Sequence, residues 1–478
     1  MEYKVKNNMG GTARLTRENI FRHASVLGRQ LLIYRKLLKE PVYAAFLEVL
    51  DCLSREEVEA EKLLSACQNF FWLLAEKSEL YPGEIVGDPW KNYLLDQIIL
   101  SDNVFTRKAA LKDRTAMGPA LIQAVQHDLR ILQMMAGWGE ASYREASALL
   151  APAGRDDTLP NWSAFNPLSR HRPLGPAEKV RQRIKKELAS VPDWDRTGLE
   201  LLADYYAAHG SGVFGEFWAF RWVRGKDGGY LEGIANPDPI RLEDLVGYEK
   251  ERAEVVQNTE KFLRGLPASN VLLYGARGTG KSSTVKGLLH SYGEQGLRLI
   301  ELPKRYLRDY QEILKIIASQ PQKFIIFLDD LSFEEEEIEY KELKGLLEGS
   351  LQAKPDNVLV YATSNRRHLV KEYFSDRELG PQEGKTQEVR QADTVQEKLS
   401  LAERFGLTVV FYTPDQEEYW AIVKELAAQR GITMEEEELR QQALKWALFQ
   451  NGISGRTARQ FVDYLYSELK LHAEAPAE

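Results

Sequence analysis

The chain has 478 residues, of which 44% are hydrophobic and 28% are charged, and its formal net charge is −8. These values predict two to four ordinary globular domains and argue against a chain-wide nucleic-acid-binding surface. The seven histidines are scattered, and neither they nor the two cysteines show metal-binding spacing. No signal peptide is apparent and no apolar run could span a membrane, so we expect a cytoplasmic protein without a membrane partner.

The first half of the chain is predicted to be mainly helical. Apolar residues recur at helical spacing from about Thr16 to Leu150, which indicates a helical N-terminal domain over residues 1–150. Residues 151–235 follow as a linker, with a basic-faced helix near Ala177–Ser190 and a β-hairpin between Phe214 and Glu232. The aromatic residues of the hairpin could stack on nucleic-acid bases, but we favour a small apolar core at a domain junction.

From Pro237 onward, apolar strands alternate with helices. The expected strands are Asn270–Tyr274, Leu297–Leu302, Phe324–Leu328, Asn357–Thr363 and Leu407–Tyr412. This alternation predicts an α/β core with a five-stranded parallel sheet over residues 236–412. Residues 413–472 are expected to form a helical segment whose first helix is capped by Thr413, and residues 473–478 form an acidic tail.

A glycine loop between a strand and a helix has the spacing G-x-x-x-x-G-K-[ST]. Glycines let the backbone turn its N–H groups toward phosphate oxygens, and the start of the helix adds positive potential. Lys281 is expected to reach the β- and γ-phosphates, and the hydroxyl of Ser282 to ligate Mg²⁺. The predicted phosphate-binding residues are Gly275, Ala276, Arg277, Gly278, Thr279, Gly280, Lys281, Ser282 and Ser283.

Two of the expected strands end in polar residues. Asp329 and Asp330 end one of them about 50 residues after the loop, and Asn365 ends the next. Because parallel strands deliver these residues to the edge where ligands bind, Asp329 is expected to hold Mg²⁺ through water and Asp330 to orient the attacking water.

Two arginine segments complete a pattern that resembles the AAA+ ATPases. Arg404 precedes Phe-Gly at the end of a helix, whereas Arg456 and Arg459 lie at a helix start, where a cation is unfavourable and suggests an anionic partner. The likeness runs from about residue 241 to residue 471. It implies a P-loop module followed by a helical lid, with ATP and Mg²⁺ as ligands.

The resemblance also implies roles for single residues. Val246 and Gly247 would lie beside adenine, and Asn365 would be the first sensor of the γ-phosphate. Arg404 would act on the nucleotide of a neighbouring subunit, which requires a ring or a helical filament. Arg456 would be the second sensor, with Arg459 as the alternative.

A closer resemblance is to a bacterial AAA+ family known only as a domain of unknown function. It is carried by Gly275–Ser283, Leu328–Glu334 and Tyr361–His368. One departure from the wider superfamily is Asp330, where most members carry glutamate. The shorter side chain predicts slower hydrolysis unless a carboxylate of Glu334–Glu337 assists. Residues Ser375–Glu397, poor in apolar residues, are expected to form a mobile loop.

Three functions fit these observations. The first is an ATP-driven oligomer that remodels or switches a partner protein held by the N-terminal domain. The second is a DNA-acting ATPase similar to replication initiators or helicase loaders, although no helix-turn-helix or zinc module follows the lid. The third is a nucleotide-gated binding switch with little turnover, for which Asp330 is the main support. Tyr306 and Tyr310 lack the surrounding pore signature of unfoldases, so we expect them to pack.

Overall fold

The computed structural model describes residues 4–6, 12–14, 16–111, 117–151, 159–160, 165, 174–226, 228–332, 342–345, 347, 355–365, 404–450 and 452–474. The chain forms two compact units, Met1–Glu216 and Phe217–Glu478. This division differs from the predicted boundaries at residues 150 and 235. The helices that follow residue 174 belong to the first unit, and the aromatic hairpin belongs to the second.

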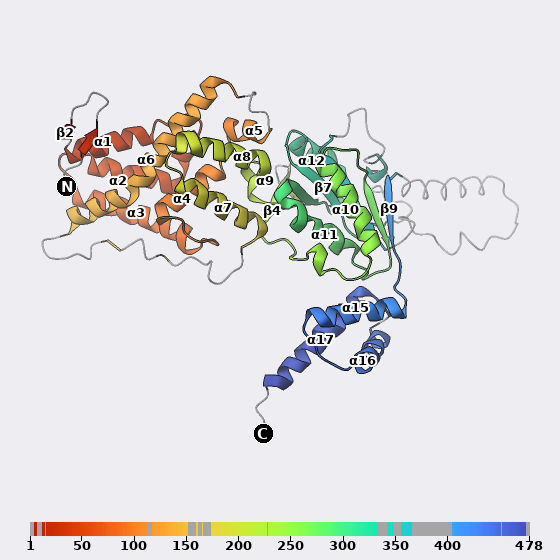
Figure 1. Ribbon diagram of the computed structural model, residues 1–478. Helices are drawn as coiled ribbons and strands as arrows, with labels where there is room; N and C mark the ends of the chain where they lie inside the picture. Colours follow the sequence, from red (N-terminus) through yellow and green to blue (C-terminus); the bar gives the residue numbers. More distant parts are fainter. Residues whose placement is uncertain are drawn as a thin grey trace. The chain divides into compact units, whose positions relative to one another are not determined.

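The first unit is mainly helical, as the apolar periodicity predicts (Figure 1). A short antiparallel pair, β1 (Lys4–Lys6) and β2 (Thr12–Arg14), precedes its helices. The helices are α1 (Arg17–Gly28), α2 (Pro41–Leu53), α3 (Ala60–Glu79), α4 (Pro89–Ile99), α5 (Val104–Ala110), α6 (Pro119–Leu150), α7 (Pro176–Ser190), α8 (Leu199–His209) and α9 (Gly212–Glu216). Trp90 of α4 is fully buried against the rings of Tyr43, Phe46 and Phe70, and its Nε1 donates to the Met135 carbonyl at 2.9 Å. The unit therefore has an aromatic core of its own.

Among the described residues, one sheet of seven strands organises the second unit. Its order is β4-β3-β6-β7-β8-β5-β9. The strands are β3 (Ala219–Gly225), β4 (Gly228–Ile234), β5 (Val271–Gly275), β6 (Leu297–Glu301), β7 (Lys323–Leu328), β8 (Val358–Ser364) and β9 (Leu407–Phe411). The five predicted strands are confirmed and pair in parallel, but the predicted count was too small. The hairpin joins the sheet because β3 also pairs in parallel with β6.

Three aromatic side chains at the start of the hairpin are core residues, whereas Tyr230 of β4 is 49% exposed. Trp218, Phe220 and Trp222 are at most 3% exposed. The Nε1 of Trp222 donates to Oδ2 of Asp309 at 2.9 Å, so even its polar edge is satisfied inside the protein. Packing, rather than base stacking, therefore explains these residues. Tyr310 is likewise buried, as expected.

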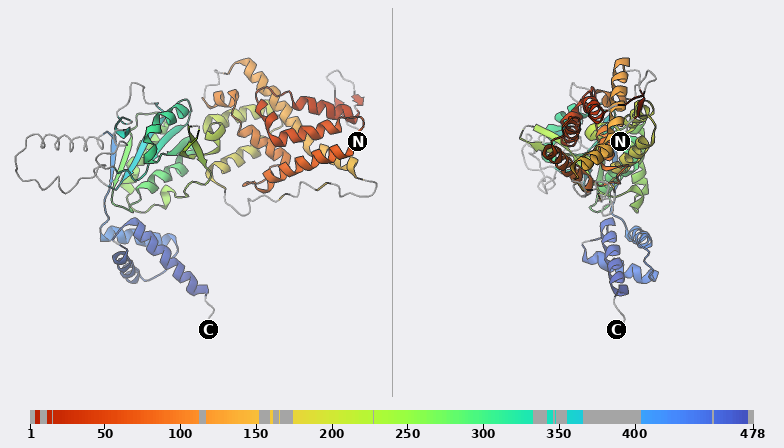
Figure 2. Two further views of the ribbon diagram at one scale, coloured as in Figure 1. Left: turned by 180° about the vertical axis from the view of Figure 1, so that it is seen from behind. Right: turned by 90° about the vertical axis from the view of Figure 1, so that its left-hand side faces the viewer.

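Helices lie between the strands of the sheet in the sequence, and further helices follow its last strand. Those between the strands include α10 (Glu249–Leu263), α11 (Lys281–Tyr292) and α12 (Tyr310–Ile317), and α11 packs beside β6 and β8. After β9 come α15 (Gln416–Gln429), α16 (Glu436–Phe449) and α17 (Gly455–Glu474) (Figure 2). These helices share a core that includes Tyr419 and Phe461. We call these three helices the lid.

The first lid helix begins later than predicted. Asp415, not Thr413, is its N-cap, and its carboxylate accepts from the N–H of Glu418 at 2.8 Å while Glu418 accepts from the N–H of Asp415 at 3.0 Å. An aspartate at this position completes a reciprocal capping box, which Thr413 does not make. Pro414 consequently lies outside the helix.

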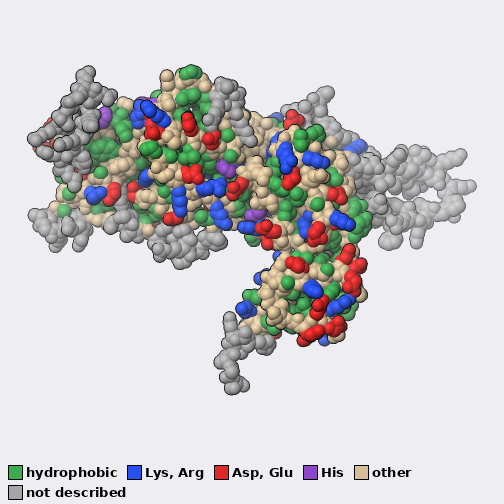
Figure 3. All heavy atoms as spheres, viewed as in Figure 1, with side chains coloured by type: hydrophobic (Ala, Val, Ile, Leu, Met, Phe, Trp, Pro, Cys, Tyr) green, Lys and Arg blue, Asp and Glu red, His purple; other side chains and the backbone are tan. Residues whose placement is uncertain are grey.

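Acidic side chains gather on the lid (Figure 3). They include the first-turn residues Glu417 and Glu418 of α15 and Glu436, Glu437 and Glu438 of α16. Carboxylates at helix starts are stabilised by the helix dipole, so this acidity supports local structure. Among the described residues, no helix has the length and apolar character needed to cross a bilayer.

Candidate nucleotide-binding site

A cavity of about 580 Å³ lies where β5, β7 and β8 end, next to the lid. Most residues expected to bind nucleotide line it. These are Val246, Arg277, Gly278, Thr279, Gly280, Lys281, Ser282, Ser283, Asp329, Asp330, Asn365, Arg456 and Arg459. Four other predicted residues, Gly247, Gly275, Ala276 and Arg404, are not among the described residues that line it.

The glycines of the loop are required by its backbone. Gly275, Gly278 and Gly280 have φ values of 141°, 77° and 90°, which L-residues with a side chain rarely adopt. A Cβ at Gly275 would lie 1.9 Å from the carbonyl oxygen of Phe411. Position 275 must therefore be glycine for the chain to leave β5, pass close to β9 and enter α11.

Lys281 is almost completely buried at the start of α11. Its Nζ donates to the carbonyls of Gly275 at 3.0 Å and Ala276 at 2.6 Å, and to Oδ1 of Asn365 at 3.2 Å. Burial is the main cause that lowers the pKa of Lys281 to about 8, a value that already includes the opposing effect of the nearby Asp330 and Asp329 and the smaller lowering by Arg456. A phosphate group next to this amine would stabilise its charged form.

The two aspartates are held by different partners. Oδ1 of Asp329 accepts from the hydroxyl of Ser282 at 2.6 Å, and Oδ1 of Asp330 accepts from Nδ2 of Asn365 at 2.6 Å. A hydroxyl and a carboxylate in contact form an oxygen donor set that suits Mg²⁺. Asp330 has a φ of 52°, a left-handed conformation that aspartate tolerates better than most residues.

Thr363 is a site residue that the sequence analysis missed. It is 2% exposed. Its Oγ1 donates to Oδ1 of Asp329 at 2.6 Å and accepts from the N–H of Asp330 at 2.9 Å. No signal in the sequence points to this role, because it follows from the register of the sheet, in which Leu328 pairs with Ala362 and so brings the next residues of the two strands together.

An apolar side of the cavity lies next to the segment that holds Val246. Tyr248 has a φ of 60°, donates its hydroxyl to the Tyr412 carbonyl at 2.8 Å and has its ring centroid 5.3 Å from that of Phe411. Ile422 and Leu426 of α15 line the same cavity. They were missed because only the packing of the lid brings them here.

Arg252 of α10 is another cavity residue that sequence reasoning missed. It donates to the carbonyl of Gly247 and forms an ion pair with Glu249 at 3.2 Å. These bonds stabilise the backbone of the segment that would face a base.

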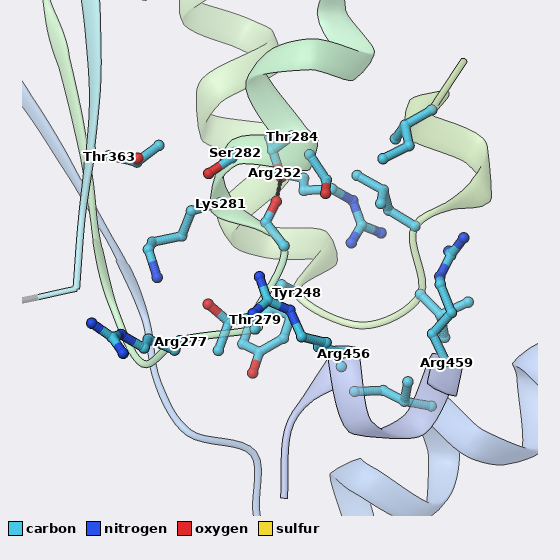
Figure 4. Close-up of a pocket in the computed structure, with 18 of the residues that line it drawn as sticks. Tyr248, Arg252, Arg277, Thr279, Lys281, Ser282, Thr284, Thr363, Arg456 and Arg459 are labelled. Atoms are coloured by element: carbon cyan, nitrogen blue, oxygen red, sulfur yellow. Dashed lines mark hydrogen bonds between the residues drawn. The ribbon is translucent and has the colours of Figure 1, made fainter. Parts of the chain in front are cut away.

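Two arginines reach the cavity from the start of α17. The N–H of Arg456 donates to the carbonyl of Gly278 at 2.9 Å, which connects the lid directly to the loop. Arg459 donates to the carbonyl of Asp244 at 2.9 Å. Figure 4 shows Arg456 nearer than Arg459 to Thr279 of the loop. Of the two arginines, Arg456 is therefore the one bonded directly to the loop.

Residues 215–469 match the model of a family described as Protein of unknown function (DUF815). The chain belongs to this family. The match spans more than half of the chain and includes the sheet, the loop and most of the lid. It confirms the predicted resemblance to a family known only as a domain of unknown function.

Other relatives of the DUF815 chain are more distant. A 98-residue stretch is 30% identical to the replication factor C large subunit of Staphylothermus marinus and covers 20% of this chain and 23% of that relative. The Thermotoga maritima RuvB Holliday junction branch migration motor is 16% identical, with a TM-score of 0.32 over 49% of this chain and 67% of that one. For the FIGL-1 AAA domain in complex with ADP, the identity is 17% and the TM-score 0.31, over 50% of this chain and 76% of that one. Scores this low add nothing to the family match.

Some predictions for this DUF815 protein concern residues outside those described. They are the possible assistance by Glu334–Glu337, the expected mobile loop Ser375–Glu397 and the end of the acidic tail.

Proposed function

We propose that this DUF815 protein binds ATP with Mg²⁺, hydrolyses it as an oligomer and uses the cycle to remodel or switch a partner protein. The observation that carries the proposal is the convergence of Lys281, the Ser282–Asp329 pair and the Asn365–Asp330 pair on one cavity. Cation, hydroxyl, carboxylate and amide are the groups that phosphoryl transfer requires.

Each group has a distinct part in the proposed mechanism. The loop N–H groups and Lys281 bind the phosphates, and Ser282 and Asp329 would hold Mg²⁺, which neutralises phosphate charge when bound. Asp330 accepts a hydrogen bond from the attacking water and so orients it toward the γ-phosphate. Asn365 holds the Asp330 carboxylate through the 2.6 Å contact and thereby fixes the direction of that water.

The lid offers a route from nucleotide to conformation. Arg456 belongs to α17, and its N–H bonds to the loop carbonyl of Gly278. A γ-phosphate attracts the guanidinium of Arg456, so ATP is expected to favour a closed lid more than ADP does. A partner held by the first unit would then respond to the nucleotide state through the oligomer.

ATPase rate measured against protein concentration tests the proposal, with oligomer size measured alongside. We expect magnesium-dependent turnover in the wild type, with specific activity rising as oligomers form. Lys281→Ala is expected to abolish nucleotide binding and to set the background rate. Wild-type turnover equal to that background would contradict hydrolysis.

A nucleotide-gated switch is the second candidate, favoured by the short side chain of Asp330 and its left-handed backbone. This alternative predicts ATP binding of normal strength with turnover close to the Lys281→Ala background. Binding measured by fluorescence of a labelled ATP, next to the rate, separates the two functions.

A further inference from the structure

We propose that Thr363 is a positioning residue that fixes the two aspartates of the site relative to each other. Its role depends on the proposed function, because it acts through residues that would serve Mg²⁺ and the attacking water. Thr363 itself would touch neither.

The hydroxyl of Thr363 is used twice. It donates to Oδ1 of Asp329 at 2.6 Å and accepts from the backbone N–H of Asp330 at 2.9 Å. One hydroxyl has a single proton and two lone pairs, so the two bonds are compatible. The side chain is 2% exposed, so solvent does not compete for either bond. The hydroxyl oxygen of Thr363 on β8 therefore bonds to both Asp329 and Asp330, the two residues that follow β7.

The sheet explains why a threonine can reach both residues. β7 and β8 are neighbours in parallel, with Leu328 opposite Ala362. The chain then turns at Asp330, whose φ is 52°, and Thr363 accepts the N–H at this turn. Asn365, the residue directly after β8, holds the Asp330 side chain. The backbone of Asp330 is thus anchored on β8 and its carboxylate on the residue that follows this strand.

A second contact shows what Thr363 would preserve. Ser282 donates to the same Oδ1 of Asp329 at 2.6 Å, and Figure 4 shows Thr363 on β8 facing Ser282 at the start of α11. If Ser282 turns to ligate Mg²⁺, its hydrogen bond to Asp329 is lost. The bond from Thr363 would then keep the carboxylate of Asp329 oriented. Thr363 should consequently matter when Mg²⁺ is present and be dispensable for magnesium-free nucleotide binding.

The test compares Thr363→Val, which keeps the shape but lacks the hydroxyl, with Thr363→Ser, which retains it. Binding of labelled ATP is measured with EDTA and then across a Mg²⁺ titration, in the full chain. For Thr363→Val, we expect unchanged binding in EDTA and about a 10-fold higher Mg²⁺ concentration for the half-maximal effect, the size typical of lost partners of metal ligands. Thr363→Ser is expected to restore the wild-type Mg²⁺ response.

Ser364→Ala is the matched control. Ser364 is the next residue of the strand, is also buried, and donates to the carbonyl of Leu331 at 2.7 Å rather than to an aspartate. We expect its Mg²⁺ response to equal that of the wild type. Melting temperatures of all variants report folding, and Thr363→Cys, a weak donor, replaces Thr363→Val if the latter does not fold.

Two results would overturn the role of Thr363. One is a wild-type Mg²⁺ response in Thr363→Val, and the other is an equal loss of binding with and without Mg²⁺, which would indicate general damage to the cavity. A wild-type protein that binds no ATP would overturn the proposed function as well, and this is visible before any variant is made.

Discussion

Lys281 is a buried cation whose surroundings change when nucleotide arrives. Burial lowers its pKa to about 8, and a bound phosphate is expected to raise the pKa above that value because its negative charge stabilises the ammonium form. At a pH between the pKa of Lys281 in the free protein and its pKa in the ATP complex, the complex holds more protons than the free protein. ATP affinity should therefore be constant well below pH 8 and fall as the pH rises through about 8, with proton uptake on binding.

Calorimetry at pH 8.5, in two buffers of different ionisation enthalpy, measures this uptake. The apparent binding enthalpies should differ in the direction of proton uptake by the protein. Lys286→Met serves as the control, because Lys286 lies on the same helix with 39% of its side chain exposed and pairs with Asp238, not with the loop. Equal enthalpies in both buffers would mean that Lys281 is already charged before ATP binds.

The sequence was most informative about residues whose role depends on local spacing. Glycines, Lys281 and Ser282 follow from one motif, and Asp329 from the end of one strand. Thr363 was not predicted because its two bonds depend on the register between strands that are distant in sequence. The same reason applies to Ile422, which reaches the cavity only through the lid.

At the scale of elements, the buried parallel strands were predictable, and the addition of the hairpin at one edge of the sheet was not. Runs such as Phe324–Leu328 are apolar at every position because both faces are covered. The hairpin β3–β4 was recognised from its aromatic and apolar residues followed by a pair of glycines. Its parallel pairing with β6 could not be foreseen, since nothing in a strand's composition specifies a distant neighbour.

The passage from β5 into α11 depends on one glycine, and a pair of substitutions tests this. Gly275→Ala places a Cβ 1.9 Å from the Phe411 carbonyl at a φ of 141°, so we expect a loss of about 3 kcal/mol in the stability of the second unit. Gly265→Ala shares the positive φ, at 71°, but meets no atom within 4 Å, and about 1 kcal/mol is expected. Denaturant unfolding of both variants provides the measurement. Equal losses of stability in the two variants would show that glycine is required at position 275 for its backbone conformation and not for the close contact with β9.

At the scale of the whole molecule, we propose that the site takes an arginine from another copy of the chain. Arg404, the residue proposed for this role, is not among the described residues that line the cavity of its own chain. A contact in which one subunit's arginine enters the next subunit's cavity is head-to-tail, and repeated contacts of this kind form rings or filaments. An arginine that stabilises the transferring phosphoryl group contributes about 10³-fold or more to the rate.

Mixing two inactive variants tests donation between subunits. Arg404→Ala should bind ATP normally and lose about 10³-fold in turnover, whereas Lys281→Ala should not bind ATP but keeps Arg404. In a mixture, the intact cavity of one variant meets the intact arginine of the other, so partial activity should return. Arg430→Ala is the control for loss of a surface arginine, because Arg430 pairs with Asp463 on the lid, and its turnover should be unchanged.

If Arg404→Ala is inactive and the mixture stays inactive while the variants form mixed oligomers, Arg404 acts within its own chain. If Arg404→Ala is fully active, it has no part in hydrolysis.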